Sequence, residues 1–278
     1  MKNIIIALLL SVFAFAKAYT QNIEGIATYQ TQRHVEMKLD SSSGMTDEMH
    51  KSIQEQLRKQ FQRKYDLTFK GSQALWQQQP EELAKPQAPS SGGMVITVSA
   101  SKDVLFQDIA AKKYTQQSDL MGKLFLIEDK LEKPEWKLEK ETKNIGQYTC
   151  FKATLEEEQE ERSTEIVDGE SKTVTKTTTR KITAWYTLDI PLSHGPDEFW
   201  GLPGLILEVN DGKLSMMCTK VVLNPKEPIA IVVPVKGKKV DQATYDETAR
   251  KKSEELMERM QSNRKKGDGS MMTISIKG

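Results

Sequence analysis

Few residues of this chain combine the types and spacing that catalysis requires, and those that do lie in one short stretch. Ser193 and His194 are adjacent, and Asp197 and Glu198 follow within four residues. A serine hydrolase needs the hydroxyl to contact an imidazole that an acid orients. Adjacent residues in a turn rich in proline and glycine point in different directions, so this contact is not favoured. The chain also has no Gly-x-Ser-x-Gly or His-Glu-x-x-His motif. A hydrolase therefore stays an alternative hypothesis, with no catalytic residue assigned.

The sequence gives little support for a metal site. Its three histidines, His34, His50 and His194, are far apart in the chain, and a three-histidine site would need all of them. Residues 156–161 are mostly glutamates. A hard-cation loop needs ligands at spacings fixed by turns, and this run lacks them, so we expect a solvated surface there. We predict no metal and no cofactor.

The two cysteines, Cys150 and Cys218, both lie in strand-like stretches. In an exported chain, two cysteines are enough for one disulfide. Such a bridge would close a loop of roughly 70 residues and would stabilise the fold by about 4 kcal/mol in the chain-entropy account. The alternative is a pair of separate buried thiols. A catalytic thiol is not favoured, because neither cysteine is near a histidine in sequence.

The N-terminus has the pattern of an export signal. Lys2 is followed by a short apolar run at residues 4–16, and Ala16-Lys17-Ala18 has the small-x-small form of a cleavage site. The run is shorter than the roughly 20 residues that a membrane-spanning helix needs. Residues 1–18 are therefore interpreted as a signal peptide, and the mature protein is expected in the periplasm or outside the cell after cleavage near Ala18. We do not expect the protein to span a membrane.

The net charge argues against nucleic acid as a partner. The full chain carries a formal charge of +1, and removing residues 1–18 takes away Lys2 and Lys17 but no acid, leaving −1. Binding to a phosphate backbone, or docking on anionic lipid, requires a strongly basic face.

Alternating apolar residues and regularly spaced turns predict a mostly antiparallel β protein of the α+β class, with about ten strands. Expected strands lie at 22–39, 66–77, 94–98, 104–106, 112–116, 123–127, 136–140, 148–153, 171–190, 205–209, 214–223, 229–235 and 271–276, and expected helices at 46–64 and 241–265. We expect a single domain over 19–278, built as a curved sheet or half-barrel with one or two amphipathic helices packed on it. Residues 78–93, rich in Gln, Pro, Ser and Gly, predict a mobile loop, and 156–180 predict a protruding hairpin. Asn210-Asp211-Gly212 predicts a turn that joins 205–209 to 214–223 as a second hairpin.

The rest of the chain is expected to be organised around residues 200–209. Gly201 and Gly204 bracket a leucine and a proline, and an apolar run follows. Glycine can adopt a positive φ or permit a close backbone approach, while Pro203 fixes its own φ and biases Leu202 toward an extended backbone. The pattern predicts a tight turn into a buried strand. It is not a phosphate loop, because no Lys-Ser/Thr and no helix follow the glycines.

The segment Gly201-Leu202-Pro203-Gly204-Leu205-Ile206 resembles the signature of the GLPGLI family. Residues 183–187, 146–153 and 223–226 resemble further blocks of that family, so the resemblance covers roughly residues 100–230. It implies an exported protein, found mainly in Bacteroidota, with a mostly β fold and no established activity. It transfers no functional residue to this chain.

Three classes of function remain open. The favoured one is a non-catalytic ligand-binding or carrier module for an apolar or peptide-like small ligand, because a curved sheet can enclose an apolar concavity. The candidate lining residues are Trp185, Tyr186, Phe199, Trp200 and Leu202, although all five could simply form the core. The second class is an envelope protein that uses its 156–180 arm to contact an outer-membrane receptor or transporter. The hydrolase is the third.

Overall fold

A computed structural model describes residues 23–33, 48, 62–79, 103–167 and 170–264. Within these ranges the chain forms one 12-stranded sheet with the spatial order β12-β6-β5-β4-β3-β2-β1-β11-β10-β9-β8-β7. Every neighbouring pair of strands is antiparallel except β12 and β6. The predicted class, a mostly antiparallel α+β fold, is therefore confirmed.

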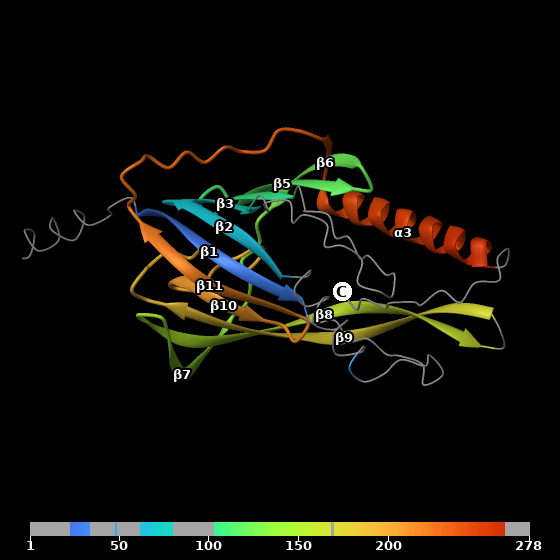
Figure 1. Ribbon diagram of the computed structural model, residues 1–278, viewed down its shortest axis with the longest axis horizontal. Helices are drawn as coiled ribbons and strands as arrows, with labels where there is room; N and C mark the ends of the chain where they lie inside the picture. The colour runs from blue at the N-terminus through green and yellow to red at the C-terminus, as the bar shows by residue number, and fades with distance from the viewer. Residues whose placement is uncertain (1–22, 34–47, 49–61, 80–102, 168–169, 265–278) are drawn as a thin grey trace, which may run out of the picture.

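All the strands but β12 overlap strands expected from the sequence (Figure 1). They are β1 (Glu24–Arg33), β2 (Gln62–Lys70), β3 (Gln73–Gln78), β4 (Val104–Asp108), β5 (Lys113–Leu120), β6 (Lys123–Lys130), β7 (Lys137–Ile145), β8 (Tyr148–Val167), β9 (Glu170–Thr187), β10 (Leu205–Asn210), β11 (Leu214–Leu223) and β12 (Lys238–Val240). The expected single strand at 66–77 is wrong. It is the hairpin of β2 and β3, whose turn places Gly71 at φ 57°.

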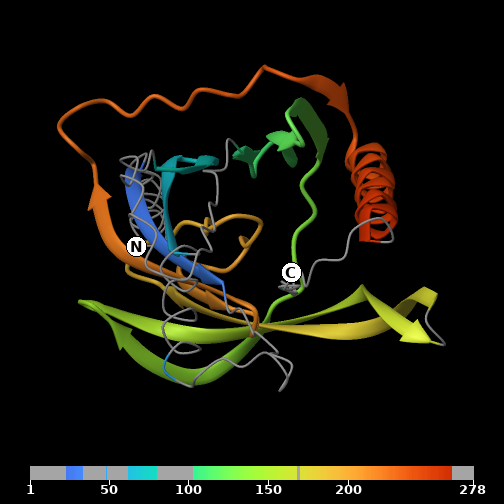
Figure 2. The same ribbon diagram turned by 45° about the vertical axis from the view of Figure 1, so that its right-hand side comes forward.

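The sheet bends around an interior but does not close into a barrel. In Figure 2, β7, β8 and β9 form one side of the bend, β1 and β11 form the next, and β5 and β6 lie on the far side. The two edge strands, β12 and β7, do not pair with each other. The loop that joins β9 to β10 lies inside the bend (Figure 2). The outer parts of β8 and β9, paired as far as Val167 and Glu170, extend beyond the rest of the sheet (Figure 1).

The core lies on the concave side of the sheet, where every second residue of the central strands is buried. In β1, Ala27 and Tyr29 are fully buried while their neighbours are partly exposed. This is the period of a strand with one face on the core. Tyr29 packs edge-on against Trp76, and its hydroxyl donates a 2.6 Å hydrogen bond to the carbonyl of Ile206. The central strand is thus tied directly to the motif segment.

Turn chemistry sets the β10–β11 hairpin as predicted. Asn210 and Asp211 accept hydrogen bonds from the backbone N–H groups of Gly212, Lys213 and Leu214, at 2.8, 2.9 and 2.6 Å. Gly212 has φ 86°, which glycine adopts at little cost. The predicted buried strand after the motif is also confirmed, since Leu205, Ile206, Leu207 and Val209 of β10 are at most 1% exposed.

The expected strand at 229–235 is wrong. Residues 224–237 instead form a long segment without regular structure that crosses outside the sheet from β11 to β12 (Figures 1 and 2). Val232 and Val235 are 71% and 77% exposed. Pro228 and Pro234 cannot donate to a ladder, which removes two of the hydrogen bonds that a central strand would need. The apolar composition of 229–235 predicted a buried strand, but a segment that lacks these two backbone donors cannot pair fully within a sheet.

Helix α3 (Gln242–Arg264) matches the predicted C-terminal helix, but it does not lie along the sheet. Asp241 caps it by accepting a 2.8 Å hydrogen bond from the N–H of Thr244. Near its start, Tyr245 packs edge-on against Phe125 and hydrogen bonds to Ser118. Further along, Leu256 is 42% exposed, so the helix is anchored at its N-terminal end.

Several predictions lie outside the described residues. These are the signal peptide at 1–18, most of the helix at 46–64, most of the loop at 78–93, and the strands at 94–98 and 271–276. Residues 62–64, at the end of the predicted helix, belong to β2.

Candidate functional site

The loop between β9 and β10 is held inside the bend by contacts to distant parts of the chain. His194 is 1% exposed, and its Nε2 lies 2.8 Å from the carbonyl of Gly71. The Nε1–H of Trp136 donates a 2.8 Å hydrogen bond to the carbonyl of Trp200. Within the loop, the N–H of Gly201 donates to the carbonyl of Ser193 at 2.9 Å. These contacts hold the loop in place inside the bend of the sheet.

The two motif glycines are required for different reasons. Gly201 has φ 94°, a conformation that other residues rarely adopt, and a Cβ there would lie 3.3 Å from the side chain of Lys133. At Gly204 a Cβ would lie 1.9 Å from the carbonyl oxygen of Thr187, which is backbone of β9. The first glycine provides a turn and the second permits a close approach of two backbones. Both roles were expected from the sequence, although it did not assign them individually.

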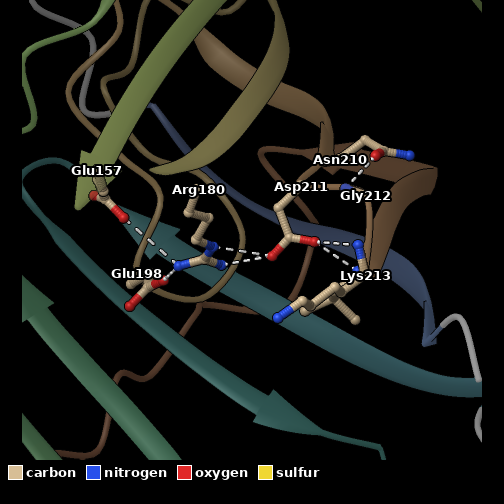
Figure 3. Close-up of polar contacts among 8 residues, drawn as sticks. Glu157, Arg180, Glu198, Asn210, Asp211, Gly212 and Lys213 are labelled. Atoms are coloured by element: carbon tan, nitrogen blue, oxygen red, sulfur yellow. Dashed lines mark hydrogen bonds and ion pairs between the residues drawn. The ribbon is translucent and has the colours of Figure 1, made fainter. Parts of the chain in front are cut away.

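Arg180 of β9 also contacts the interior loop, through Glu198 and Phe199 (Figure 3). Its guanidinium donates to Asp211 at 2.7 and 3.0 Å and to Glu198 at 2.9 Å, and it lies 3.6 Å from Glu157. It also lies 5.4 Å from the centre of the Phe199 ring, as a cation–π contact requires. One side chain thus joins the hairpin arm, the interior loop and the β10–β11 turn.

Asp197 is a titrating group within the loop. It has φ 54°, is half-buried, and its carbonyl lies 3.4 Å from Nε2 of Gln107. Burial, with a smaller contribution from the charge of Glu198, raises the pKa of Asp197 to about 7. The ordinary unfolded pKa of an aspartate is about 3.9. The folded state therefore binds more protons than the unfolded state between about pH 4 and 7, and stability falls as the pH rises through that window.

Replacing Asp197 by asparagine should remove this penalty. We expect Asp197→Asn to stabilise the protein at pH 8 by about 1–2 kcal/mol, since a neutral amide keeps the shape and tolerates a positive φ, and the full shift is discounted for partial exposure. Urea unfolding at pH 5 and pH 8 measures the effect, with Glu135→Gln as a control for loss of one exposed charge. Equal stabilisation at both pH values would contradict the assignment.

A cavity of about 540 Å³ opens where the interior loop meets two other segments. The loop contributes Ser193, Trp200 and Gly201. The β4–β5 turn contributes Ile109 and Lys112, and the end of β6 with the residues after it contributes Lys130, Leu131, Glu132 and Lys133. The N–H of Leu131 donates to the carbonyl of Lys112 at 3.0 Å, which holds these last two segments together. Small-molecule sites commonly have volumes of about 300–1,000 Å³.

Of the five predicted lining residues, only Trp200 lines this cavity. Phe199 and Leu202 are buried in the core. Tyr186 is buried as well and packs against Phe151 with 6.0 Å between ring centres. Trp185, on the other face of β9, is covered by Lys143, whose Nζ lies 4.4 Å from the ring centre and 2.6 Å from Glu208. The surroundings of these four residues therefore fit a structural role in the core or on the sheet surface.

The structure also separates the residues of the hydrolase hypothesis. Ser193 lines the cavity, whereas the imidazole of His194 is enclosed against Gly71 and packs 6.2 Å from the Phe69 ring. Burial lowers the pKa of His194, which favours its neutral form. Within the described ranges, no three His, Cys, Asp or Glu side chains are grouped as a metal ion would require. No helix in those ranges is both long and apolar enough to span a membrane.

The expected disulfide is not formed. Cys150 on β8 and Cys218 on β11 are buried free thiols. Two strands, β9 and β10, lie between them, so the cysteines sit on strands roughly 14 Å apart along the sheet, at about 4.8 Å for each step. A disulfide needs Cα atoms within about 7 Å. Burial raises the pKa of both thiols to about 11, which keeps them protonated and unreactive near neutral pH.

A comparison with protein families matches part of the chain. Residues 136–208 match a family described as "Protein of unknown function (Porph_ging)". The match begins at Trp136, which bonds to the loop, and ends in β10, so it covers the arm and the whole interior loop. No curated protein matches the sequence significantly.

Among solved structures, PNGF-II in the C2 and P21 space groups is similar to this chain, with a TM-score of 0.46 and 16% identity in both cases. The similarity covers 82% and 83% of this chain but 33% of PNGF-II, so the chain spans about a third of that protein's length.

Sequence reasoning missed the lysines of the cavity and the role of Arg180. The lysines are spread over three positions between 112 and 133, and only the β4–β5 turn packed against the end of β6 brings them together. Arg180 stands among threonines and lysines of a strand that looks uniformly solvated. A lone arginine in such a strand was the available signal, but its three acidic partners are 18 to 31 residues away.

Proposed function

We propose that the protein is an exported, non-catalytic binding protein of the cell envelope that holds a small ligand in the cavity beside Trp200. The main observation in support is that cavity of about 540 Å³, which is formed partly by a loop that hydrogen bonds hold inside the bend of the sheet. Pre-formed concave sites bind small molecules well, because little ordering is needed when the ligand arrives. The GLPGLI hexapeptide and the signal-like residues 1–18 support membership of the exported GLPGLI family.

Geometry favours binding over catalysis at this position. Ser193 is the sole hydroxyl among the lining residues, and the nearest histidine in sequence, His194, is directed to a backbone carbonyl. A nucleophile needs a base within hydrogen-bond reach, and His194, the base of the hydrolase hypothesis, is not among the lining residues. The apolar lining from Ile109, Leu131 and Trp200 suits a ligand with an apolar part.

The neutral fluorescent probe N-phenyl-1-naphthylamine tests this proposal. Wild-type protein should bind it saturably with one probe per chain, and Ile109→Trp should weaken binding at least tenfold by filling the cavity. Fluorescence titration measures both, and circular dichroism checks that the variant folds. Non-saturable uptake, or uptake that Ile109→Trp leaves unchanged, would contradict the proposal.

A variant without residues 158–176 serves as the control. It removes the outer part of the β8–β9 hairpin but none of the residues that line the cavity. The probe should therefore bind it as it binds the wild type. Loss of binding on this deletion would point to the arm, and so to the alternative of an interaction protein.

A further inference from the structure

The charges around the cavity are unbalanced. Lys112, Lys130 and Lys133 line it together with a single acid, Glu132, although the whole chain is close to neutral. All four side chains are exposed. None of the three lysines forms an ion pair with another described residue, whereas elsewhere Lys70, Lys143 and Lys152 are paired with glutamates.

The fold itself brings these like charges together. Lys113 and Lys130 are directly opposite in the β5–β6 register, and Lys112 precedes the first of them. Like charges placed directly opposite on neighbouring strands are destabilising. On the β8–β9 hairpin, by contrast, Lys181 lies opposite Glu156 and forms an ion pair with it. A bound anion would offset the repulsion at the cavity.

The apolar part of the cavity lies beside this charge. A Cβ on Gly201 would lie 3.3 and 3.5 Å from Cγ and Cε of Lys133, so the lysine stem packs over the motif glycine. Long lysine side chains commonly lay their methylenes on apolar surface and leave the ammonium in water. An apolar floor next to unpaired ammonium groups is complementary to a molecule with one apolar part and one acidic group.

We propose that the ligand is an amphipathic anion, in which a carboxylate, sulfate, sulfonate or phosphate group meets Lys112, Lys130 and Lys133 while an apolar body rests on Ile109, Leu131 and Trp200. This inference rests on the proposed function, because it specifies what the same cavity binds. It assigns a charge requirement that neither the motif nor the family match contains.

Two probes that differ by one group test it. 8-Anilinonaphthalene-1-sulfonate is N-phenyl-1-naphthylamine with a sulfonate added. The sulfonate should bind the wild type about tenfold more tightly than the neutral probe, as expected if each exposed charge contributes modestly. The combined variant Lys112→Gln, Lys130→Gln and Lys133→Gln should abolish that difference, because it weakens binding of the sulfonate far more than binding of the neutral probe. Raising sodium chloride from 50 to 500 mM should weaken only the sulfonate.

The matched control changes three exposed lysines that do not line the cavity, Lys220→Gln, Lys226→Gln and Lys236→Gln. It alters the net charge equally and should keep the sulfonate preference. If the neutral probe binds as tightly as the sulfonate, or if both triple variants lose the preference alike, the anion inference fails while binding stands. If neither probe binds saturably, the proposed function fails as well. Displacement of the sulfonate by 10 mM inorganic phosphate would contradict the need for an apolar body.

Discussion

Gly204→Ala should leave the protein unfolded or largely unfolded at 25 °C, with a loss of at least about 4 kcal/mol of a total that is commonly 5–15 kcal/mol. The added methyl would lie 1.9 Å from the carbonyl oxygen of Thr187 and 2.7 Å from its carbonyl carbon. Both are backbone atoms of a fully buried residue, so no side chain can turn aside to make room. Either the loop leaves the interior or β9 separates from β10.

Gly146→Ala is the matched control for this result. Gly146 also has a positive φ, 57°, but a Cβ there would meet nothing within 4 Å. Its cost should be about 1 kcal/mol, from backbone conformation alone. Urea unfolding followed by circular dichroism, with soluble yield as a second readout, compares the two. If Gly204→Ala were no worse than Gly146→Ala, the loop would not dock on β9 as described.

Arg180→Ala should cost about 2–3 kcal/mol, because it leaves Asp211 in the fold without its cationic partner. The carboxylate of Asp211 is only 8% exposed, and it also holds the β10–β11 turn through the N–H groups of Lys213 and Leu214. This loss of stability is smaller than that for a fully buried ion pair, because the Arg180 side chain is 22% exposed. Lys181→Ala, which breaks the exposed pair with Glu156, should cost less than about 0.5 kcal/mol.

The pH dependence gives this prediction an independent check. Burial alone would raise the pKa of Asp211, but hydrogen bonds from Leu214 and Arg180 hold it below its usual value. Stability from such a group is present above the unfolded pKa of about 3.9 and is lost as the pH falls through the folded pKa. The difference between wild type and Arg180→Ala should therefore be full at pH 6 and shrink below about pH 4. A difference that does not depend on pH would mean that Arg180 acts by packing alone.

Local sequence signals predicted much of the fold. Asn210-Asp211-Gly212 predicted a hairpin because each of those residues favours the turn by its own chemistry, and the hydrogen bonds that Asn210 and Asp211 accept confirm it. The motif glycines were identified as positions where the backbone needed freedom, and both positions do need it. These inferences succeeded because the interactions behind them span only a few residues.

The remaining features depend on partners far away in the chain. Residues 229–235 have the composition of a buried strand, but burial requires a free sheet edge, and both sides of β11 are already occupied by β1 and β10. Trp185 and Trp200 look equivalent in sequence, yet one is covered by Lys143 and the other faces a cavity. The exposure of residues 229–235 and the different surroundings of the two tryptophans are all decided by the order of the strands in the sheet.

The position of β1 has a consequence for how the chain folds. This first strand lies in the middle of the sheet, and its register matches Gly25 with Leu223, nearly 200 residues later. Pairings of such long sequence separation are entropically costly to nucleate and slow folding. The sheet cannot be completed until β11 is available to pair with β1, so a chain truncated before residue 214 would leave one edge of β1 without this partner and should be prone to aggregate.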